Sequence, residues 1–176
     1  MIDKFSILGK IYFKILYQIN RVNCVQKLGV CAGSNLHIYG KVEFGTEPWL
    51  ITIGNNVYLT NGVKFITHDG GTLLFRKYIP DLEITKPIIL GNDVYVGNNV
   101  LLLPGVTVGN KVVIGAGAIV TKNIPDNSIV AGVPAKVIKT ADEYFEKIKK
   151  ESLHLGHLKG KEKDKALKKY YNYSRG

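Results

Sequence analysis

The sequence predicts an all-β solenoid, a chain wound into stacked triangular coils, and one repeat carries most of that prediction. Counting from Leu90 in steps of six gives an unbroken aliphatic series, and a second small or aliphatic residue stands four places after most of its members. The two series are Leu90, Val96, Leu102, Val108, Ile114 and Val120, and Val94, Val100, Val106, Val112 and Ala118. A period of six fits neither a half-buried strand nor a helix. It is typical of a parallel β-helix in which three short faces make one coil.

Glycine and asparagine recur between the aliphatic positions. Both tolerate positive φ, which tight corners require. The corner residues so assigned are Gly54, Gly91, Gly97, Gly109 and Gly115, with Asn55, Asn56, Asn92, Asn98, Asn99 and Asn110.

The six-residue step also extends toward the N-terminus. Ile53, Leu59 and Phe65 form one predicted coil, and Val30, Leu36 and Val42 form an earlier one. The register slips at residues 48–50. We therefore expect the β-helix domain to span residues 28–140.

The repeat fails between Phe65 and Leu90, which are 25 residues apart and so not separated by a multiple of six. We expect a loop to leave the coil at about residues 70–86. Long excursions from a compact domain are uncommon unless they have a function.

The two ends of the chain differ from the coil in charge. Residues 1–27 hold five Lys and Arg against one acid, residues 28–135 seven against seven, and residues 136–176 twelve against six. Residues 1–27 predict a cationic amphipathic helix that packs on the coil end or on a neighbouring subunit, with peripheral contact to an anionic membrane as the alternative. Residues 141–176 predict a helix broken near 156–160 and a basic tail.

Length and composition limit the class of protein. A chain of 176 residues with 45% hydrophobic and 22% charged residues indicates one soluble globular domain with appendages. The net charge of +10 lies at the ends of the chain. A nucleic-acid partner is therefore not expected, since it calls for a basic stripe on the folded face. Cys24 and Cys31 form no CxxC motif and no disulfide framework, which favours a cytoplasmic location.

Residues 89–139 resemble the hexapeptide acyltransferases, which are left-handed β-helix enzymes that transfer acetyl from acetyl-CoA. The motifs IGAGAIVTKNIP and AGVPAKVI carry the resemblance. The segments EPWLITIGNNV and FITHDGG are similar to the galactoside, maltose and capsular group, which O-acetylates sugars and surface polysaccharides. The resemblance covers about residues 28–140. It implies a left-handed coil, acetyl-CoA as co-substrate, a sugar or glycan acceptor, and a homotrimer with active sites between subunits.

His68 is the candidate general base. It follows Phe65 by three residues, where the coil gives way to the loop, so we expect it at the mouth of a cleft. Histidine titrates near neutral pH and is suited to remove a proton from a hydroxyl that attacks a thioester. The resemblance implies the same role, and a purely structural turn histidine is the alternative. Glu47, Asp69 and a backbone carbonyl remain open as partners of the second ring nitrogen.

The resemblance also implies contacts with acetyl-CoA. The matched positions are Asn98 and Ala116 beside the pantetheine arm, Thr121 and Lys122 along pantetheine and nucleotide, and Lys136 and Lys139 near the phosphates. Coil packing is the alternative for Ala116 and Thr121. Tyr95 stands where several similar enzymes have tryptophan, and packing alone is the alternative to a role for its hydroxyl. The oxyanion donor is open between that hydroxyl and a backbone N–H near Gly97.

The acceptor pocket is expected to include an aromatic side chain with hydrogen-bonding neighbours near the mouth. The candidates are Trp49, Tyr58, Asn61 and Arg76. Arg76 would suit a carboxylate or phosphate on an acidic glycan, and a solvated loop cation is the alternative.

Together these features predict an acetyl-CoA-dependent O-acetyltransferase with a histidine base and direct transfer in a ternary complex. The alternatives are an N-acetyltransferase on a free or nucleotide-linked amino sugar and a non-catalytic β-helix scaffold. No metal is expected, because only His37 and His68 lie in the coils and a zinc site of the hydratase type needs three histidines.

Overall fold

The computed structural model describes residues 20–173. Contacts within the chain divide it into two units, Met1–Ala141 and Asp142–Gly176, which are taken separately below. Residues 1–19, which hold most of the predicted N-terminal amphipathic helix and its alternative membrane contact, lie outside the described residues.

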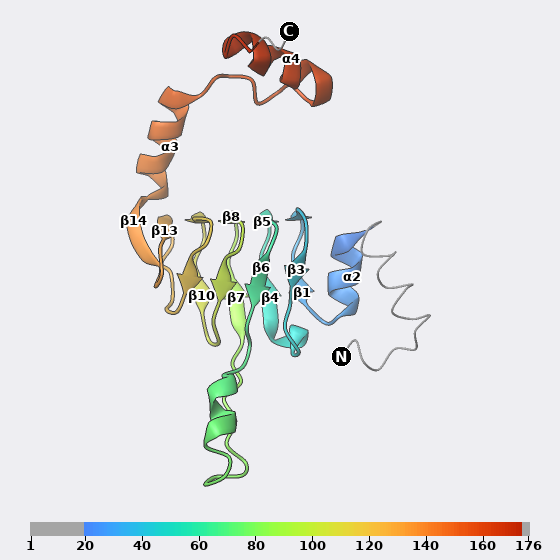
Figure 1. The fold of residues 1–176 in the computed structure, drawn as a ribbon, viewed down its shortest axis with the longest axis vertical. Helices are drawn as coiled ribbons and strands as arrows, with labels where there is room; N and C mark the ends of the chain where they lie inside the picture. Colours follow the sequence, from blue (N-terminus) through green and yellow to red (C-terminus); the bar gives the residue numbers. More distant parts are fainter. Residues whose placement is uncertain (1–19, 174–176) are drawn as a thin grey trace. The chain divides into compact units, whose positions relative to one another are not determined.

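The first unit contains a three-sided parallel β-helix, as predicted (Figure 1). From β1 to β13, successive strands in the sequence fall on different sides, so each strand pairs with the equivalent strand of the next coil. The first side comprises β1 (Cys31–Ala32), β4 (Ile51–Ile53), β7 (Ile88–Leu90) and β10 (Thr107–Val108). The second comprises β2 (Leu36–Ile38), β5 (Val57–Leu59), β8 (Val94–Val96), β11 (Val112–Ile114), β13 (Ser128–Ala131) and β14 (Lys136–Thr140). The third comprises β3 (Val42–Glu43), β6 (Val63–Phe65), β9 (Leu101–Leu102) and β12 (Ile119–Val120).

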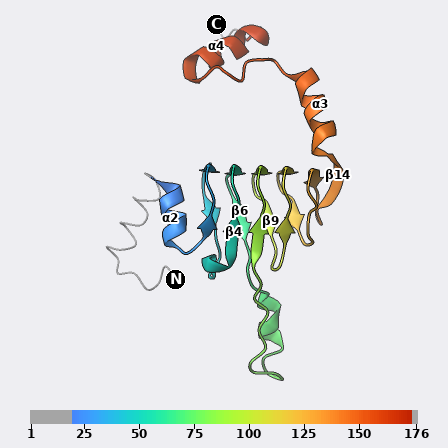
Figure 2. The ribbon, with the colours of Figure 1, turned by 180° about the vertical axis from the view of Figure 1, so that it is seen from behind.

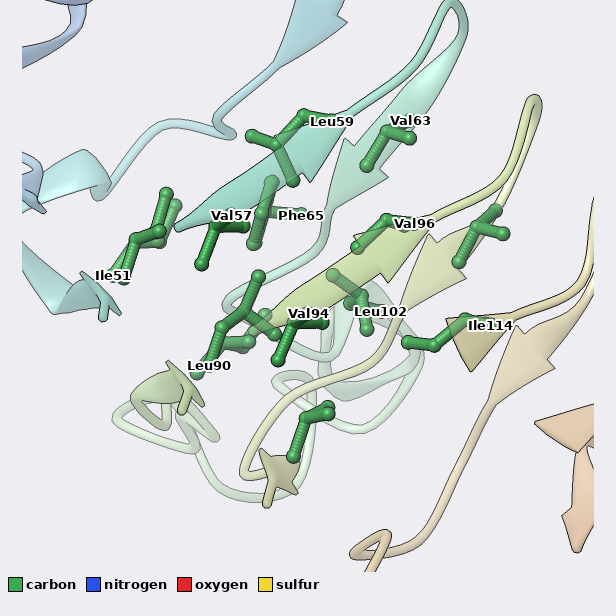
Figure 3. Close-up of a cluster of buried hydrophobic side chains, with 14 of the residues drawn as sticks. Ile51, Val57, Leu59, Val63, Phe65, Leu90, Val94, Val96, Leu102 and Ile114 are labelled. Carbon is green, nitrogen blue, oxygen red and sulfur yellow. The ribbon is translucent and has the colours of Figure 1, made fainter. Parts of the chain in front are cut away.

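The core is a column of aliphatic side chains inside the coils, together with Phe44 and Phe65 (Figure 3). Three-residue strands such as β5 and β8 bury their first and last residues and turn the middle one outward. The repeat residues identified from the sequence are therefore the buried ones. Each fully buried aliphatic side chain contributes about 1.5–3 kcal/mol relative to an exposed one.

The corner between the first and second sides is called here the asparagine corner, and a ladder of side-chain hydrogen bonds links its successive coils. Asn92 Oδ1 accepts from the backbone N–H of Asn55 at 2.8 Å, and Asn110 Oδ1 accepts from that of Asn92 at 2.8 Å. Asp126 Oδ1 continues the ladder to the N–H of Asn110 at 2.7 Å. Gly54 fits beneath this ladder because a Cβ there would lie 2.5 Å from the carbonyl oxygen of Gly91.

The two ends of the coil stack are built differently (Figure 2). Helix α2 (Arg21–Lys27) buries Cys24 and Val25 at the first coil. At the other end, β14 runs antiparallel to β13, unlike every other pairing in the coil. Of the predicted helical segment 1–27, the structure describes residues 20–27, and residues 21–27 of these are helical.

The chain leaves the coil between β6 and β7, where the repeat fails, and forms the loop drawn in green in Figure 1. Two backbone hydrogen bonds form its neck. The N–H of Asp69 donates to the carbonyl of Ile84 at 2.9 Å, and that of Lys86 donates to the carbonyl of Thr67 at 2.8 Å. A 3-10 helix (Gly70–Leu74) begins the loop.

The second unit contains most of α3 (Ala141–Glu151) and all of α4 (Gly160–Tyr170). The helix break therefore begins at residue 152, earlier than the predicted 156–160, and α4 takes up much of the predicted tail. Within residues 20–173, no helix combines the length and the apolar character needed to cross a bilayer.

Candidate functional site

The site is centred on His68 and Glu47, which come from neighbouring coils at the corner between the third and first sides. We call this the His68 corner. Nδ1 of His68 lies 3.2 Å from Oε2 of Glu47. The side chain of His68 is 43% exposed, whereas that of Glu47 is 24% exposed. The imidazole is thus held at one edge by a carboxylate and is partly exposed to solvent.

Two threonines hold the carboxylate in place. Thr67 Oγ1 donates to Oε2 of Glu47 at 2.5 Å, and Thr46 Oγ1 donates to Oε1 at 2.6 Å. Burial raises the pKa of Glu47, but the hydrogen bonds from Thr46, Thr67 and His68 outweigh it and leave that pKa below its usual value. Glu47 is therefore ionised at neutral pH.

Gly45 allows these groups to approach. It has a φ of +65°, and a Cβ at this position would lie 3.0 Å from the carbonyl oxygen of Phe65 and 3.2 Å from Oγ1 of Thr67. The 3-10 helix of Pro48–Leu50 then returns the chain to β4. The predicted slip in register at residues 48–50 is this helix.

The ionised carboxylate fixes the imidazole tautomer. A carboxylate only accepts hydrogen bonds, so the ring nitrogen that faces Glu47 carries the proton. In the neutral ring, Nε2 then keeps its lone pair and is chemically able to accept a proton. This arrangement of carboxylate and imidazole is the one that general-base histidines use.

His68 lies between two pockets. One, of about 450 Å³, continues along the corner past Lys86, Leu103 and Pro104 to Thr121. The other, of about 360 Å³, lies under the base of the loop, where Glu47, Thr72 and Arg76 line it. A group bound in either pocket is adjacent to the same imidazole.

The structure separates the two carboxylates that the sequence left open as partners of His68. Asp69 does not pair with the ring. Its Oδ1 accepts from the backbone N–H of Gly71 at 2.9 Å and caps the 3-10 helix of the loop. Of these two carboxylates, only that of Glu47 forms a hydrogen bond with His68, and the backbone-carbonyl alternative is not needed.

Arg76 lines the loop pocket, but its guanidinium is engaged within the loop. Nη2 lies 2.5 Å from Oε2 of Glu83, and Nε donates to the carbonyl of Leu82 at 3.0 Å. Trp49 is 56% exposed on the 3-10 helix after Glu47 and does not line either His68 pocket.

Tyr58 and Tyr95 lie away from His68, on the outer face of the second side. They pair in register, and the ring of Tyr58 stacks on that of His37 with centroids 4.6 Å apart. Together with Tyr39 they line a separate groove of about 480 Å³. Within one chain they therefore do not contribute to the pockets beside His68, because the middle residue of each strand points outward from its own side.

Four predicted residues lie at the corner between the second and third sides: Asn61, Gly97, Asn98 and Ala116. Asn61 Oδ1 accepts from the N–H of Lys41, and Asn98 Oδ1 accepts from that of Asn61. The N–H of Gly97 donates to the carbonyl of Ile114 at 2.8 Å and is thus unavailable as an oxyanion donor. Within the described part of the chain, the N–H of Ala116 has no hydrogen-bond partner.

The remaining predicted cofactor residues are spread along the last coils. Thr121 lines the larger pocket beside His68, and Lys122 follows it on the surface. Lys136 and Lys139 lie on β14, paired with Ala131 and Ile129 of β13.

Several residues of the site were not identified from the sequence. Thr67 is fully buried and continues the alternation of inward and outward residues after Phe65. A polar residue at such an inward position could have been identified from the sequence as a candidate site residue. Lys86 stands where the repeat resumes, immediately before Pro87. Thr46 and Glu83 gave no comparable signal, because their contacts depend on the irregular turns that contain them. Among the described residues, no cluster of three or more His, Cys, Asp and Glu side chains is placed to hold a metal ion.

Comparison with known proteins gives a consistent result. A family model described as bacterial transferase hexapeptide (six repeats) matches residues 87–122. The chain is 42% identical over 141 residues to Protein CapG of Staphylococcus aureus, an alignment that covers 79% of this chain and 82% of the relative. It is 37% identical to the galactoside O-acetyltransferase of Escherichia coli (strain K12), covering 68% of this chain and 64% of that protein.

Solved structures share the fold. A maltose O-acetyltransferase from Clostridium difficile 630 aligns with a TM-score of 0.55 and 26% identity over 73% of this chain and 84% of that chain. A galactoside acetyltransferase in complex with coenzyme A aligns with a TM-score of 0.56 and 28% identity, covering 77% and 82%. The coil is therefore a left-handed parallel β-helix. With most of its length matched at 42% identity to a relative and its repeats matched by the family model, the chain belongs to the hexapeptide-repeat family of bacterial transferases.

Proposed function

We propose that the protein is an acetyl-CoA-dependent O-acetyltransferase that acetylates a hydroxyl of a sugar or of a surface-polysaccharide precursor. The observation that carries the proposal is His68, oriented by the Glu47 carboxylate and placed between two pockets where the repeat breaks. Relatives named as galactoside O-acetyltransferase and maltose O-acetyltransferase support the choice of acetyl donor and of sugar acceptor.

The reaction requires one proton transfer in each direction. Nε2 of His68 takes the proton of the acceptor hydroxyl as its oxygen attacks the thioester carbonyl, and a tetrahedral intermediate forms. The C–S bond then breaks, and the imidazolium returns the proton to the departing CoA thiolate. Glu47 stabilises the imidazolium between these steps without leaving its hydrogen bonds to Thr46 and Thr67. The transfer is direct and involves no covalent acetyl-enzyme.

The acetyl donor is assigned to the larger pocket, where Thr121 and Lys86 lie beside His68. The free N–H of Ala116 suits a pantetheine carbonyl, and Lys122, Lys136 and Lys139 supply cations for the CoA phosphates. Tyr95 and Asn98, which lie away from His68 within one chain, complete this proposed set from a neighbouring copy.

We also propose a homotrimer in which each site lies between neighbouring copies. The proposed contacts with the acetyl donor lie at two different corners of one chain, which supports this arrangement. Thr121 lies at the His68 corner, and Ala116 lies at the corner between the second and third sides. Mixing His68→Ala with Ala116→Trp, each inactive alone, should restore about a quarter of the activity if one site draws on two copies. Mixed oligomers without any recovery would contradict this arrangement.

The test of the function is His68→Ala with acetyl-CoA and a panel of hexoses, amino sugars and nucleotide sugars. We expect kcat to fall roughly 1,000-fold while CoA still binds, as measured by calorimetry. The matched control is His37→Ala, which removes an imidazole from the outer face of the second side and should leave kcat unchanged. Retention of most activity in His68→Ala would refute the assignment of the base.

A further inference from the structure

The two pockets on either side of His68 differ in charge. The larger pocket has one cation, Lys86, and one carboxylate, Asp69, among its lining residues. The loop pocket has three carboxylates, Glu47, Asp69 and Glu83, against a single guanidinium, Arg76. With a neutral imidazole, the lining of the loop pocket therefore carries a formal charge of −2, from one cation and three anions.

The single cation of the loop pocket is already neutralised. Arg76 forms its ion pair with Glu83 and donates to the carbonyl of Leu82, so the guanidinium fastens the two limbs of the loop together. Oε1 of Glu83 in turn accepts from Oγ1 of Thr85 at 2.5 Å. An anionic ligand would need Arg76 to leave these contacts and would leave Glu83 uncompensated.

The other two carboxylates have no cationic Lys or Arg partner in the described chain. Glu47 is held by two threonine hydroxyls and by the imidazole, and its hydrogen bonds favour the ionised form. Asp69 accepts from the N–H of Gly71 through Oδ1, and it is exposed at the pocket. A negative charge placed between these groups is repelled by both.

We propose that the sugar ring entering the loop pocket carries no negative charge, so that the enzyme acetylates a neutral or amine-bearing saccharide ring and rejects uronic acids and sugar phosphates at that ring. This inference rests on the proposed function, because it assigns the acceptor to the loop pocket. The larger pocket, with Lys86 in its lining and Lys122 following Thr121, is left for the anionic donor. The net charge of the loop pocket then suits a neutral or amine-bearing acceptor, and the larger pocket, whose lining carries no net charge, does not repel the anionic donor in the same way.

The size of the effect follows from Coulomb's law. Two like charges about 6–7 Å apart in a solvent-exposed pocket repel by somewhat under 1 kcal/mol, which is about threefold in binding. Two unpaired carboxylates therefore give roughly tenfold discrimination against an acidic ring at low salt. Screening shortens the range of this repulsion, so the discrimination shrinks as salt is added.

The experiment compares acceptors in matched pairs with acetyl-CoA as donor: methyl glucoside with methyl glucuronate, methyl galactoside with methyl galacturonate, and glucose with glucose 6-phosphate. We expect kcat/KM to be at least about tenfold higher for the neutral member of each pair. Glucosamine forms a separate arm, in which alkali-labile product indicates an ester and alkali-stable product an amide. Either product is compatible with the charge rule.

Asp69→Asn tests the origin of the discrimination. The asparagine keeps an oxygen that accepts from Gly71, so the turn is preserved while one charge is lost. The ratio of neutral to acidic kcat/KM should fall about threefold. Asp81→Asn removes the same charge from the same loop, outside the residues that line the pocket, and should leave the ratio unchanged.

The outcomes separate the two proposals. Equal or better use of the acidic acceptors overturns the charge rule while the acetyltransferase assignment stands. An equal shift of the ratio in Asp69→Asn and Asp81→Asn shows a diffuse field effect and overturns the role of the pocket. Absence of acetyl transfer to every acceptor in the panel refutes the proposed function, and the charge rule falls with it.

Discussion

The asparagine corner and the His68 corner occupy the same coils but are built in opposite ways. At the asparagine corner, each coil repeats the same turn, and an amide or carboxylate oxygen accepts from the backbone of the coil before it. At the His68 corner, a 3-10 helix, the long loop and two short turns follow one another. The asparagine corner holds successive coils together through one repeated hydrogen bond. At the His68 corner the turns differ from coil to coil, so each side chain there has its own contacts.

The difference shows where regularity is required. Backbones at the asparagine corner approach so closely that no side chain fits at Gly54. At the His68 corner, the contacts between coils run through the side chains of Glu47, Thr67 and His68. Changes at the first corner should therefore affect folding, and changes at the second should affect activity.

The largest expected effect is on stability, from Gly54→Ala. The new Cβ would lie 2.5 Å from a backbone oxygen of the next coil, which moves only if the stack opens. We expect a loss of about 3 kcal/mol or more, or no folded protein. Gly70→Ala is the control, because a Cβ there meets nothing within 4 Å. Equal melting temperatures for the two variants would contradict this account of the asparagine corner.

The next effect is on activity, from Glu47→Gln. The glutamine side chain can present either its NH2 group or its oxygen to Nδ1 of His68, so it does not fix the imidazole tautomer as the carboxylate does. We therefore expect kcat to fall about 100-fold with little change in CoA binding. Glu43→Gln removes another carboxylate with a lowered pKa, one that pairs with Lys41 and Lys64 outside the site. Steady-state kinetics should show normal kcat for this control. A normal kcat in Glu47→Gln instead would exclude it as the positioning residue.

The smallest effect is on the pH dependence of stability. The pKa of Glu47 is lower in the folded protein than in the unfolded chain, so its interactions stabilise the fold above the unfolded pKa and are lost as pH falls through the folded pKa. Unfolding followed from about pH 6 to about pH 3 should show stability falling with acidification, less steeply in Glu47→Gln. An unchanged slope would mean that the carboxylate is not held by Thr46 and Thr67 in solution.

Sequence alone predicted the regular part of the molecule well, because a six-residue period leaves little choice of which side chains face inward. The same period also indicates that Tyr58 and Tyr95 occupy outward positions in the middle of their strands, away from His68. Tyr58 was expected at the acceptor pocket as an aromatic residue near the mouth, and the family resemblance implied that Tyr95 lies beside acetyl-CoA. The structure assigns them to another side of the coil.

The contacts around His68 could not be read from the period, since they form where it is interrupted. The choice between Glu47 and Asp69 depended on how the 3-10 helix of Pro48–Leu50 absorbs the slip in register. Similarly, the sequence offered Arg76 as an acceptor contact or as a solvated loop cation, but its partner Glu83 lies on the returning limb of a loop whose path has no repeat to predict it.

The neck of the loop bears on what the coil can tolerate. Because Thr67, Asp69, Ile84 and Lys86 close the excursion with backbone hydrogen bonds, this closure does not depend on the side chains beyond it. We therefore expect changes in the length or charge of residues 70–83 to leave the coil folded, even where they alter the loop pocket.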